Sequence, residues 1–464
     1  MKITLLSPPF KKDYMRNARC DFVSLSHSQW YPLWLGYCGA VLEKHGHDVQ
    51  FIDAPAMGIM HEETLKLVQE FQPQLFVVYG GEKSRDNDIE IGVRIKKAAK
   101  CPVVFVGPYV SAEPEEVMRL STDVDYAVKG EFEYPILELL EGKSVSTIQN
   151  ILYRDGSEIK KNALRPLLTG EQLDQIPYVT KFFKKHLPIK NYKTPSEYYP
   201  FVDTITGRGC AWGICTFCLW VHTFIPGVIY NLRSVDNVIG ELKFVKEQMP
   251  EVRSVMFQDD TMTTERADEL CDGIFKENLK ITWSCYARAN MKYPILKKMK
   301  DAGCRNLHVG FESANLAVLK NVKKGTTLNQ MREFAHDANK AGIQIHADFA
   351  IGYVGETVDS IKETIAFAKE IDPHTAQFQL FRPLKGTPMG EELRKKGQLT
   401  AEGYPNYPDM SEEELRYWAK KAYRDFYFRW GYVKKAVGNP QDYVFTRFDQ
   451  MARAVPHFIW KRWY

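Results

Sequence analysis

The sequence predicts an α/β fold with two parallel-sheet domains and a helical extension. Short apolar runs alternate with helical patterns over residues 1–142, and a second alternating series covers residues 196–394. Strand–helix alternation at this spacing is typical of parallel sheets covered by helices. Between the two series, residues 143–195 predict a linker, and residues 395–464 predict a helical, aromatic-rich C-terminal extension.

The first series predicts a doubly wound, Rossmann-like domain. Its expected strands are 3–6, 49–52, 75–79, 103–106 and 125–128. Such sheets bind ligands at the carboxyl ends of their strands, where glycine lets the backbone approach a bulky ligand. The alternative is that these glycines only form tight turns. The candidate binding residues at the strand ends are Pro9, Gly80, Gly107, Pro108, Tyr109, Gly130 and Glu131.

The second series predicts an open, partial (β/α)6 barrel, and the linker before it carries a hairpin pattern at 151–154 and 158–161. The six expected strands are 202–206, 254–258, 281–287, 306–310, 344–352 and 376–381. The helices that separate them are expected at 235–248, 265–278, 293–302, 316–321, 329–341 and 358–371. Active sites of barrels lie at the carboxyl ends of the strands.

Three cysteines, Cys210, Cys215 and Cys218, directly follow the first expected barrel strand. Soft thiolates this close together select zinc or an iron–sulfur cluster. Structural zinc takes four ligands, and His222 is the nearest residue that could complete such a set. Three thiolates on a [4Fe–4S] cluster leave one iron open to bind and cleave a small molecule. We therefore expect a catalytic cluster, with a zinc site or three unrelated cysteines as alternatives.

The amino-acid composition argues against several classes of protein. The net charge of +4, from 62 basic and 58 acidic residues, does not argue for nucleic-acid binding. Nine cysteines, an odd number, fit no secreted disulfide framework. The first residues have a strand pattern rather than that of a signal peptide, and no apolar run reaches the roughly 18 residues of a membrane span. These features predict a cytoplasmic protein.

The C-terminal extension combines aromatic and basic residues, most densely in its last 50 or so positions. The structural interpretation is a cap on the barrel core with a solvated basic face. The functional alternatives are a lid over the substrate or peripheral contact with an anionic membrane surface.

Short motifs follow the expected barrel strands in order. They occupy residues 206–210 with 215–218, 257–260, 283–288, 310–313, 351–357 and 383–388. With them, the second half resembles the radical S-adenosylmethionine (SAM) superfamily. The first half resembles the cobalamin-binding domain that precedes it in the class B type of that family.

The resemblance implies a [4Fe–4S] cluster on Cys210, Cys215 and Cys218 that reductively cleaves SAM to a 5′-deoxyadenosyl radical. It also implies a SAM pocket of Phe217 on the adenine, Asp259 or Asp260 on the amine, Arg288 on the carboxylate, Glu312 and Ser313 on the ribose, and backbone of Ile351 and Gly352 on the adenine edge. Loop packing of Phe217 and helix capping by Asp260 are the structural alternatives.

Two departures from the family pattern stand out. Four residues separate Cys210 from Cys215 where the family has three, and Gly213 is expected to absorb the extra one. The first domain also lacks the Asp-x-His-x-x-Gly signature after its first strand. Cobalamin would therefore bind without a histidine axial ligand.

Further phrases resemble the hopanoid-biosynthesis radical SAM proteins that form the cyclitol ether head group. They lie at residues 30–35, 53–55, 215–220, 281–285, 323–325, 342–346 and 367–375. This resemblance implies radical attack on an unactivated C–H bond, with contraction of a sugar ring on a hopanoid lipid. Its alternatives are a cobalamin-dependent C-methyltransferase, which uses the same cofactors, and a non-catalytic metal or cobalamin sensor.

Few features of the sequence indicate which residues bind the substrate. Polar residues on the last two expected strands, His346, Asp348 and Arg382 with Gln377 and Gln379, are candidates to hold a sugar, and each is equally a candidate buried polar group. Tyr14, Cys20 and His222 are weaker loop candidates. The expected partners are a small-molecule or lipid-linked sugar substrate and an external flavodoxin- or ferredoxin-type electron donor, without nucleic acid.

Overall fold

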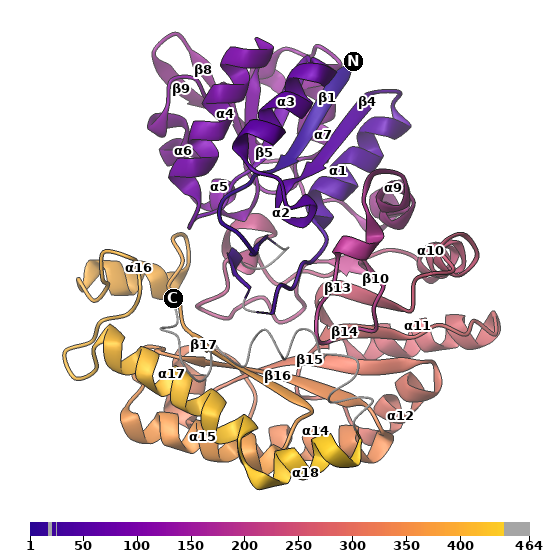
Figure 1. Ribbon diagram of the computed structural model, residues 1–464, viewed down its shortest axis with the longest axis vertical. Coiled ribbons are helices and arrows are strands. Elements are labelled where there is room, and N and C mark those ends of the chain that lie inside the picture. The colour runs from indigo at the N-terminus through magenta and orange to yellow at the C-terminus, as the bar shows by residue number, and fades with distance from the viewer. Residues whose placement is uncertain (17–20, 25, 440–464) are drawn as a thin grey trace.

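The computed structural model describes residues 1–16, 21–24 and 26–439. Figure 1 shows two sheets, one above the other, each covered by helices, with α17 (Glu412–Tyr427) and α18 (Trp430–Gly438) along the lower one. The predicted α/β class, the Rossmann-like first domain and the partial barrel are all confirmed.

The first sheet has seven strands in the order β4-β1-β5-β6-β7-β8-β9, of which β4 to β7 are parallel. Its strands are β1 Lys2–Ser7, β4 Asp48–Asp53, β5 Leu75–Tyr79, β6 Val103–Val106, β7 Tyr126–Val128, β8 Ile151–Asp155 and β9 Glu158–Lys161. The hairpin expected within the linker, β8–β9, pairs antiparallel with β7 and so extends this sheet. Buried Ile151 and Leu152 explain the pairing, because they continue the apolar core of β7.

Helices cover both faces of the first sheet. On one face, α9 of the linker packs on α1, where Phe183 and Phe182 fill the space that side chains at Gly36 and Gly39 would need. The helices of this domain and the linker are α1 Leu33–Lys44, α2 Ala54–Met57, α3 His61–Phe71, α4 Arg85–Ala99, α5 Pro108–Ala112, α6 Pro114–Leu120, α7 Glu133–Leu140, η1 Val145–Thr147, α8 Gly170–Asp174, α9 Val179–His186 and η2 Ile189–Asn191.

The second sheet has six parallel strands in chain order. They are β10 Phe201–Thr204, β13 Ser254–Met262, β14 Trp283–Ala287, β15 Cys304–Glu312, β16 Gln344–Ile351 and β17 Thr375–Leu380. The helices that cover its outer side are α10 Val235–Gln248, α11 Thr264–Lys276, α12 Tyr293–Asp301, α13 Leu316–Asn321, α14 Leu328–Ala341 and α15 Val358–Ile371. Its other side, the lumen, faces the first domain (Figure 1).

The segment between β1 and α1 reaches down to the lumen. It contains the short hairpin β2 (Tyr14–Arg16) and β3 (Asp21–Val23), and Trp30 beyond it contacts Phe201 and His308 of the second sheet. The two domains therefore share one interface, into which the carboxyl ends of the first sheet point.

The described part of the C-terminal extension caps the barrel, as the structural interpretation predicts. After α16 (Pro388–Lys395), α17 covers the edge strand β17, where the Tyr427 hydroxyl donates to Ala376 O and accepts from Ala376 N. No helix in the described residues is long and apolar enough to cross a membrane. The membrane prediction depends on the last 50 or so residues, of which 440–464 lie outside the described residues.

Candidate active site at the cysteine loop

The cysteine loop starts at the carboxyl end of β10. Two short strands, β11 (Gly207–Arg208) and β12 (Asn231–Leu232), close its base. Buried Asp259 on β13 fixes the start of the loop, because its carboxylate accepts from Thr206 N at 2.6 Å, the Thr206 hydroxyl and the Tyr230 hydroxyl. Burial raises the pKa of Asp259.

All three loop cysteines are half-buried and free of disulfides. Gly213 N donates to Cys210 Sγ at 3.5 Å, and Cys215 Sγ lies 3.8 Å from Lys323 O. Three thiolates in one loop are the ligand set that the sequence predicts for a [4Fe–4S] cluster with one open iron, in which each thiolate would bind a different iron.

His222 does not complete a zinc site. It lies on η3 (Trp220–Phe224), and its Nε2 is 3.0 Å from the carbonyl oxygen of Cys215. Gly213 is the residue expected to absorb the extra position of the loop. Gly213 has φ +56°, and a Cβ there would lie 2.4 Å from Gly227 O, so the loop turns where glycine alone fits.

Two cations lie beside Cys215. Lys324 Nζ is 2.8 Å from Glu312 Oε1, and Arg288 donates to Lys324 O while its guanidinium lies 4.4 Å from the Trp212 ring. Burial alone would lower the pKa of Lys324, but Glu312 and Cys215 raise it overall. Burial raises the pKa of the Cys215 thiol, and Lys324 and Arg288 work against that rise. Positive charge is therefore in place where thiolates must form.

The expected SAM residues divide into two groups. Phe217, Arg288 and Glu312 gather around the loop: the Phe217 ring lies 5.2 Å from Tyr353, whose hydroxyl donates to Glu312 Oε2 at 2.8 Å. Asp260 is half-buried and lies next to Asp259 on β13, in the stretch between Phe257 and Met262 where the pairing with β14 shifts register.

The other SAM candidates are already engaged. The Asp259 carboxylate serves the loop base, and the Ser313 hydroxyl lies 3.2 Å from the Thr364 hydroxyl on the outer helix α15. Ile351 O accepts from Phe381 N, while Gly352 donates to Glu356 and accepts from the Tyr407 hydroxyl. These contacts are structural: they hold the start of the cysteine loop and the ends of strands β15 and β16.

Glu356 predicts a pH dependence of stability. It is buried, and burial raises its pKa to about 8. Between its ordinary pKa and about pH 8 the folded chain keeps a proton that the unfolded chain has lost, so the free energy of unfolding falls as pH rises through this window. Urea denaturation from pH 5 to 9 should show this fall in the wild type and a smaller one in Glu356→Gln. Equal slopes would contradict the raised pKa.

The strand ends of the first domain face the cysteine loop. A Cβ at Gly130 would lie 3.1 Å from Phe224 O of η3, and one at Gly107 would lie 3.2 Å from the Tyr79 ring. Glu131 pairs with Arg208 at 2.7 Å, two residues before Cys210. Protein atoms therefore occupy the space beside both glycines, and Glu131 forms an ion pair across the domain interface.

The remaining candidates at these strand ends have structural partners. A Cβ at Gly80 would meet Val110 at 3.0 Å, and Pro9 O accepts from Asn87 at 2.8 Å. Pro108 opens α5, and the buried Tyr109 has its hydroxyl 3.4 Å from Glu116.

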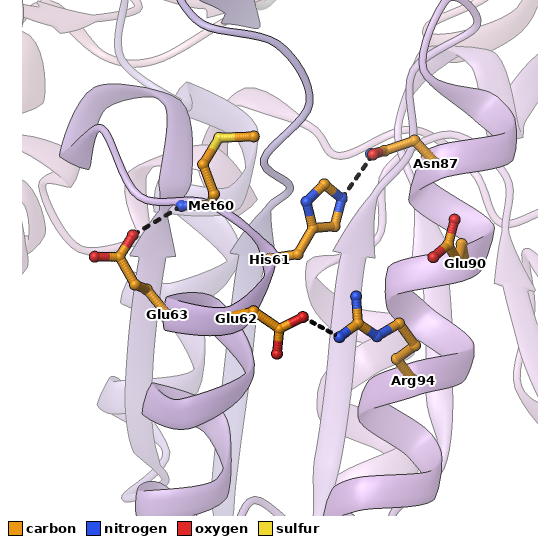
Figure 2. Close-up of a pocket in the computed structure, with 7 residues that line it drawn as sticks. All are labelled: Met60, His61, Glu62, Glu63, Asn87, Glu90 and Arg94. Atoms are coloured by element: carbon orange, nitrogen blue, oxygen red, sulfur yellow. Dashed lines mark hydrogen bonds and ion pairs between the residues drawn. The ribbon is translucent and has the colours of Figure 1, made fainter.

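A separate cleft of about 410 Å³ lies between α3 and α4 (Figure 2). Its polar side chains pair across it: His61 Nε2 is 2.7 Å from Asn87 Oδ1, and Glu62 pairs with Arg94. These pairs engage His61, Glu62 and Arg94, and the cysteine loop stays the candidate active site.

The substrate candidates fall in two places. His346 Nε2 lies 3.5 Å from Asp348 Oδ1 in the lumen. Arg382 lies beyond the end of β17, over the Tyr404 ring. Tyr14 is buried in β2, and Cys20 lies outside the described residues.

Three residues with evident roles were not predicted. Arg208 lies in the motif 206–210, and Lys324 lies in the phrase 323–325. The available signal was that Arg208 is a cation close to Cys210 and that Lys324 is a cation next to Gly325. His308 lies on β15 opposite His346, and the period of two on that strand was its only signal.

Two segments of the chain match known domain families. Residues 21–140 match the B12 binding domain, and residues 204–368 match the Radical SAM superfamily. In the structure these segments hold most of the first sheet and most of the second, together with the cysteine loop.

Curated relatives extend over most of the chain. The uncharacterized methyltransferase PH0819 of Pyrococcus horikoshii is 28% identical, over 96% of this chain and 97% of its own length. The anaerobic magnesium-protoporphyrin IX monomethyl ester cyclase of Cereibacter sphaeroides is 24% identical, over 80% and 61%. The cytidylyl-2-hydroxyethylphosphonate methyltransferase of Streptomyces wedmorensis is 25% identical, over 85% and 86%.

Among solved structures, the cobalamin-dependent SAM radical enzyme OxsB with aqua-cobalamin and SAM bound has a TM-score of 0.70 at 17% identity, covering 98% of this chain and 71% of that chain. This likeness shows a shared fold. The two domain matches confirm the prediction of a radical SAM enzyme with a [4Fe–4S] cluster, SAM and cobalamin as cofactors.

Proposed function

We propose that this radical SAM enzyme with a B12-binding domain is a C-methyltransferase that acts on an unactivated carbon of a small-molecule substrate. The observation that carries the proposal is the meeting of the cysteine loop and the glycine strand ends at one interface. The full-length relative named as a methyltransferase supports it.

The residues around the loop have distinct tasks in this proposal. Cys210, Cys215 and Cys218 would hold the cluster. When bound, the cluster supplies the electron that cleaves SAM, and cobalamin carries the methyl group. Arg288 would pair with the SAM carboxylate by a charge-assisted contact, and Phe217 would pack on the adenine. Lys324, held by Glu312, would keep positive charge beside the thiolates.

Ring contraction of a sugar on a hopanoid remains a second prediction with the same cofactors. Part of its support has another explanation in the structure. In the phrase 323–325, Lys323 O accepts from Trp212 at 2.8 Å and Lys324 pairs with Glu312, so the phrase serves the cysteine loop. It would suit either reaction. The electron donor, a lipid-linked substrate and a cytoplasmic location likewise remain predictions.

Mass spectrometry separates the two reactions. Reconstituted enzyme, cobalamin, a low-potential reductant and SAM with a deuterated methyl group would be incubated anaerobically, in one arm with a hopanoid glycoside and in another with a small-molecule extract. We expect 5′-deoxyadenosine and S-adenosylhomocysteine in about equal amounts, with a product that gains the labelled methyl group. 5′-Deoxyadenosine alone, with an unlabelled rearranged product, would overturn the proposal in favour of ring contraction.

A further inference from the structure

Three metal-ligating side chains meet in the lumen, away from the cysteine loop. His308 on β15 is the strand partner of His346 on β16, and Asp348 follows two residues later on the same face. One ligand atom from each lies within 4.8 Å of the others. Among the described residues, this is the one set of three or more His, Cys, Asp or Glu side chains gathered so closely.

The set is open to the lumen. On β16, His346 and Asp348 are 20% and 27% exposed and alternate with fully buried Ala347 and Phe349. Phe349 stacks on Phe311 at 5.6 Å, on the side covered by the outer helices. His346 and Asp348 therefore face the interface between the domains, where a ligand has access.

Each imidazole has one nitrogen directed to a supporting oxygen. His346 Nδ1 lies 2.7 Å from the Thr375 hydroxyl, which leaves Nε2 toward Asp348. His308 Nε2 lies 3.6 Å from Glu197 Oε1, and both side chains are nearly fully buried. Neither His308 Nε2 nor Glu197 Oε1 has a hydrogen-bond partner in the described structure. Metal-ligating histidines commonly direct their second nitrogen to a carboxylate or other oxygen in this way.

We propose that His308, His346 and Asp348 bind a divalent first-row transition cation such as Zn²⁺ or Fe²⁺. Two imidazoles and one carboxylate form an N/O ligand set that suits these ions and leaves coordination positions open. Bound ligand atoms lie about 3–4 Å apart around such an ion, so the half-exposed side chains need to move by only about 1 Å.

The ion would be distinct from the iron–sulfur cluster. Glu312, which holds Lys324 beside the cysteine loop, is four residues beyond His308 on β15, roughly 13 Å along the strand. An ion deeper in the lumen, with open positions, would take an oxygen of the substrate: a carboxylate, phosphonate or hydroxyl group. This last step rests on the proposed function, whereas the ion site does not.

Zinc titration of the full-length, cluster-reconstituted protein tests the site. Under anaerobic conditions and in competition with a chromophoric chelator, we expect one zinc per chain. His346→Gln and Asp348→Asn should each weaken binding by at least about 10–100-fold, because each removes a ligand atom. His336→Gln is the matched control, since His336 is exposed on α14 and should leave zinc binding unchanged.

X-ray absorption at the zinc edge identifies the ligands. Nitrogen and oxygen ligands alone, lost in both lumen variants, would support the site. Sulfur ligands, or equal affinity in the wild type and the two variants, would overturn it. The titration needs neither substrate nor SAM, so a failure of the proposed methyl transfer would leave its result intact.

Discussion

Replacing Cys218 with alanine is expected to abolish SAM cleavage while the chain stays folded. The change removes one of three thiolates, and two cannot hold a cluster with a single open iron. The loop keeps its other anchors, such as Asp259 on Thr206 and the Trp212 indole on Lys323 O. Iron content and the electron paramagnetic resonance signal of the reduced protein should be lost, and 5′-deoxyadenosine should fall to the background of a reaction without enzyme.

Cys271→Ala provides the control for this experiment. Cys271 is fully buried on α11, away from the loop, so the same chemical change there should leave iron content and SAM cleavage intact. If Cys218→Ala retained wild-type iron and SAM cleavage, the loop would not be the cluster site. Loss of iron in Cys271→Ala to the same extent would mean that the assay reports folding instead.

The barrel strands were predictable because their apolar residues leave few alternatives. The six strands of the second sheet were placed in their order, and in the first sheet the run at 103–106 is likewise the strand β6 as predicted. The hairpin β8–β9 was also recognised from sequence, but its pairing with β7 was not. Strand pairing depends on which edge is free in the folded domain, and local sequence carries no such information.

The chemistry of the loop was predictable, but not the face on which each neighbour lies. Asp259 and Asp260 are adjacent on a strand whose pairing with β14 shifts register between Phe257 and Met262, so the sequence could not tell which side chain faces the loop. The sequence offered either residue for the SAM amine, whereas the structure uses Asp259 to hold Thr206. Ser313 is a similar case, because its hydroxyl bonds Thr364 of a helix that follows much later in the chain.

Charge pairing across the domain interface could not be read from the sequence at all. Glu131 was named as a cobalamin contact because it ends a strand of the first sheet. Its partner, Arg208, is 77 residues away in the chain. Only the folded interface brings them together, and the same interface explains why Gly130 packs against the carbonyl of Phe224.

Arg208→Met is expected to lower the free energy of unfolding by about 3–5 kcal/mol. The Arg208 guanidinium lies 2.7 Å from both Glu131 and Glu133, and all three side chains are at most 7% exposed. Without the cation, two buried carboxylates face each other unpaired. Burial already raises the pKa of Glu131 and Arg208 opposes that rise, so the carboxyl should also protonate more readily in the variant. Urea denaturation of the cofactor-free protein measures the loss.

Two comparisons distinguish the loss of stability from breaking the buried bridge of Arg208 from the loss caused by removing any positive charge. Arg165→Met breaks the more exposed Arg165–Glu138 pair of the first domain and should cost no more than about 1 kcal/mol. Adding Glu131→Gln and Glu133→Gln to Arg208→Met removes the stranded charges and should restore much of the stability. If Arg208→Met cost no more than Arg165→Met, the bridge would not stabilise the interface.

Because Arg208 stands two residues before Cys210, a stable bridge also means that docking of the B12-binding domain fixes the base of the cysteine loop. Arg208→Met should therefore lose iron more readily than Arg165→Met on dilution into chelator.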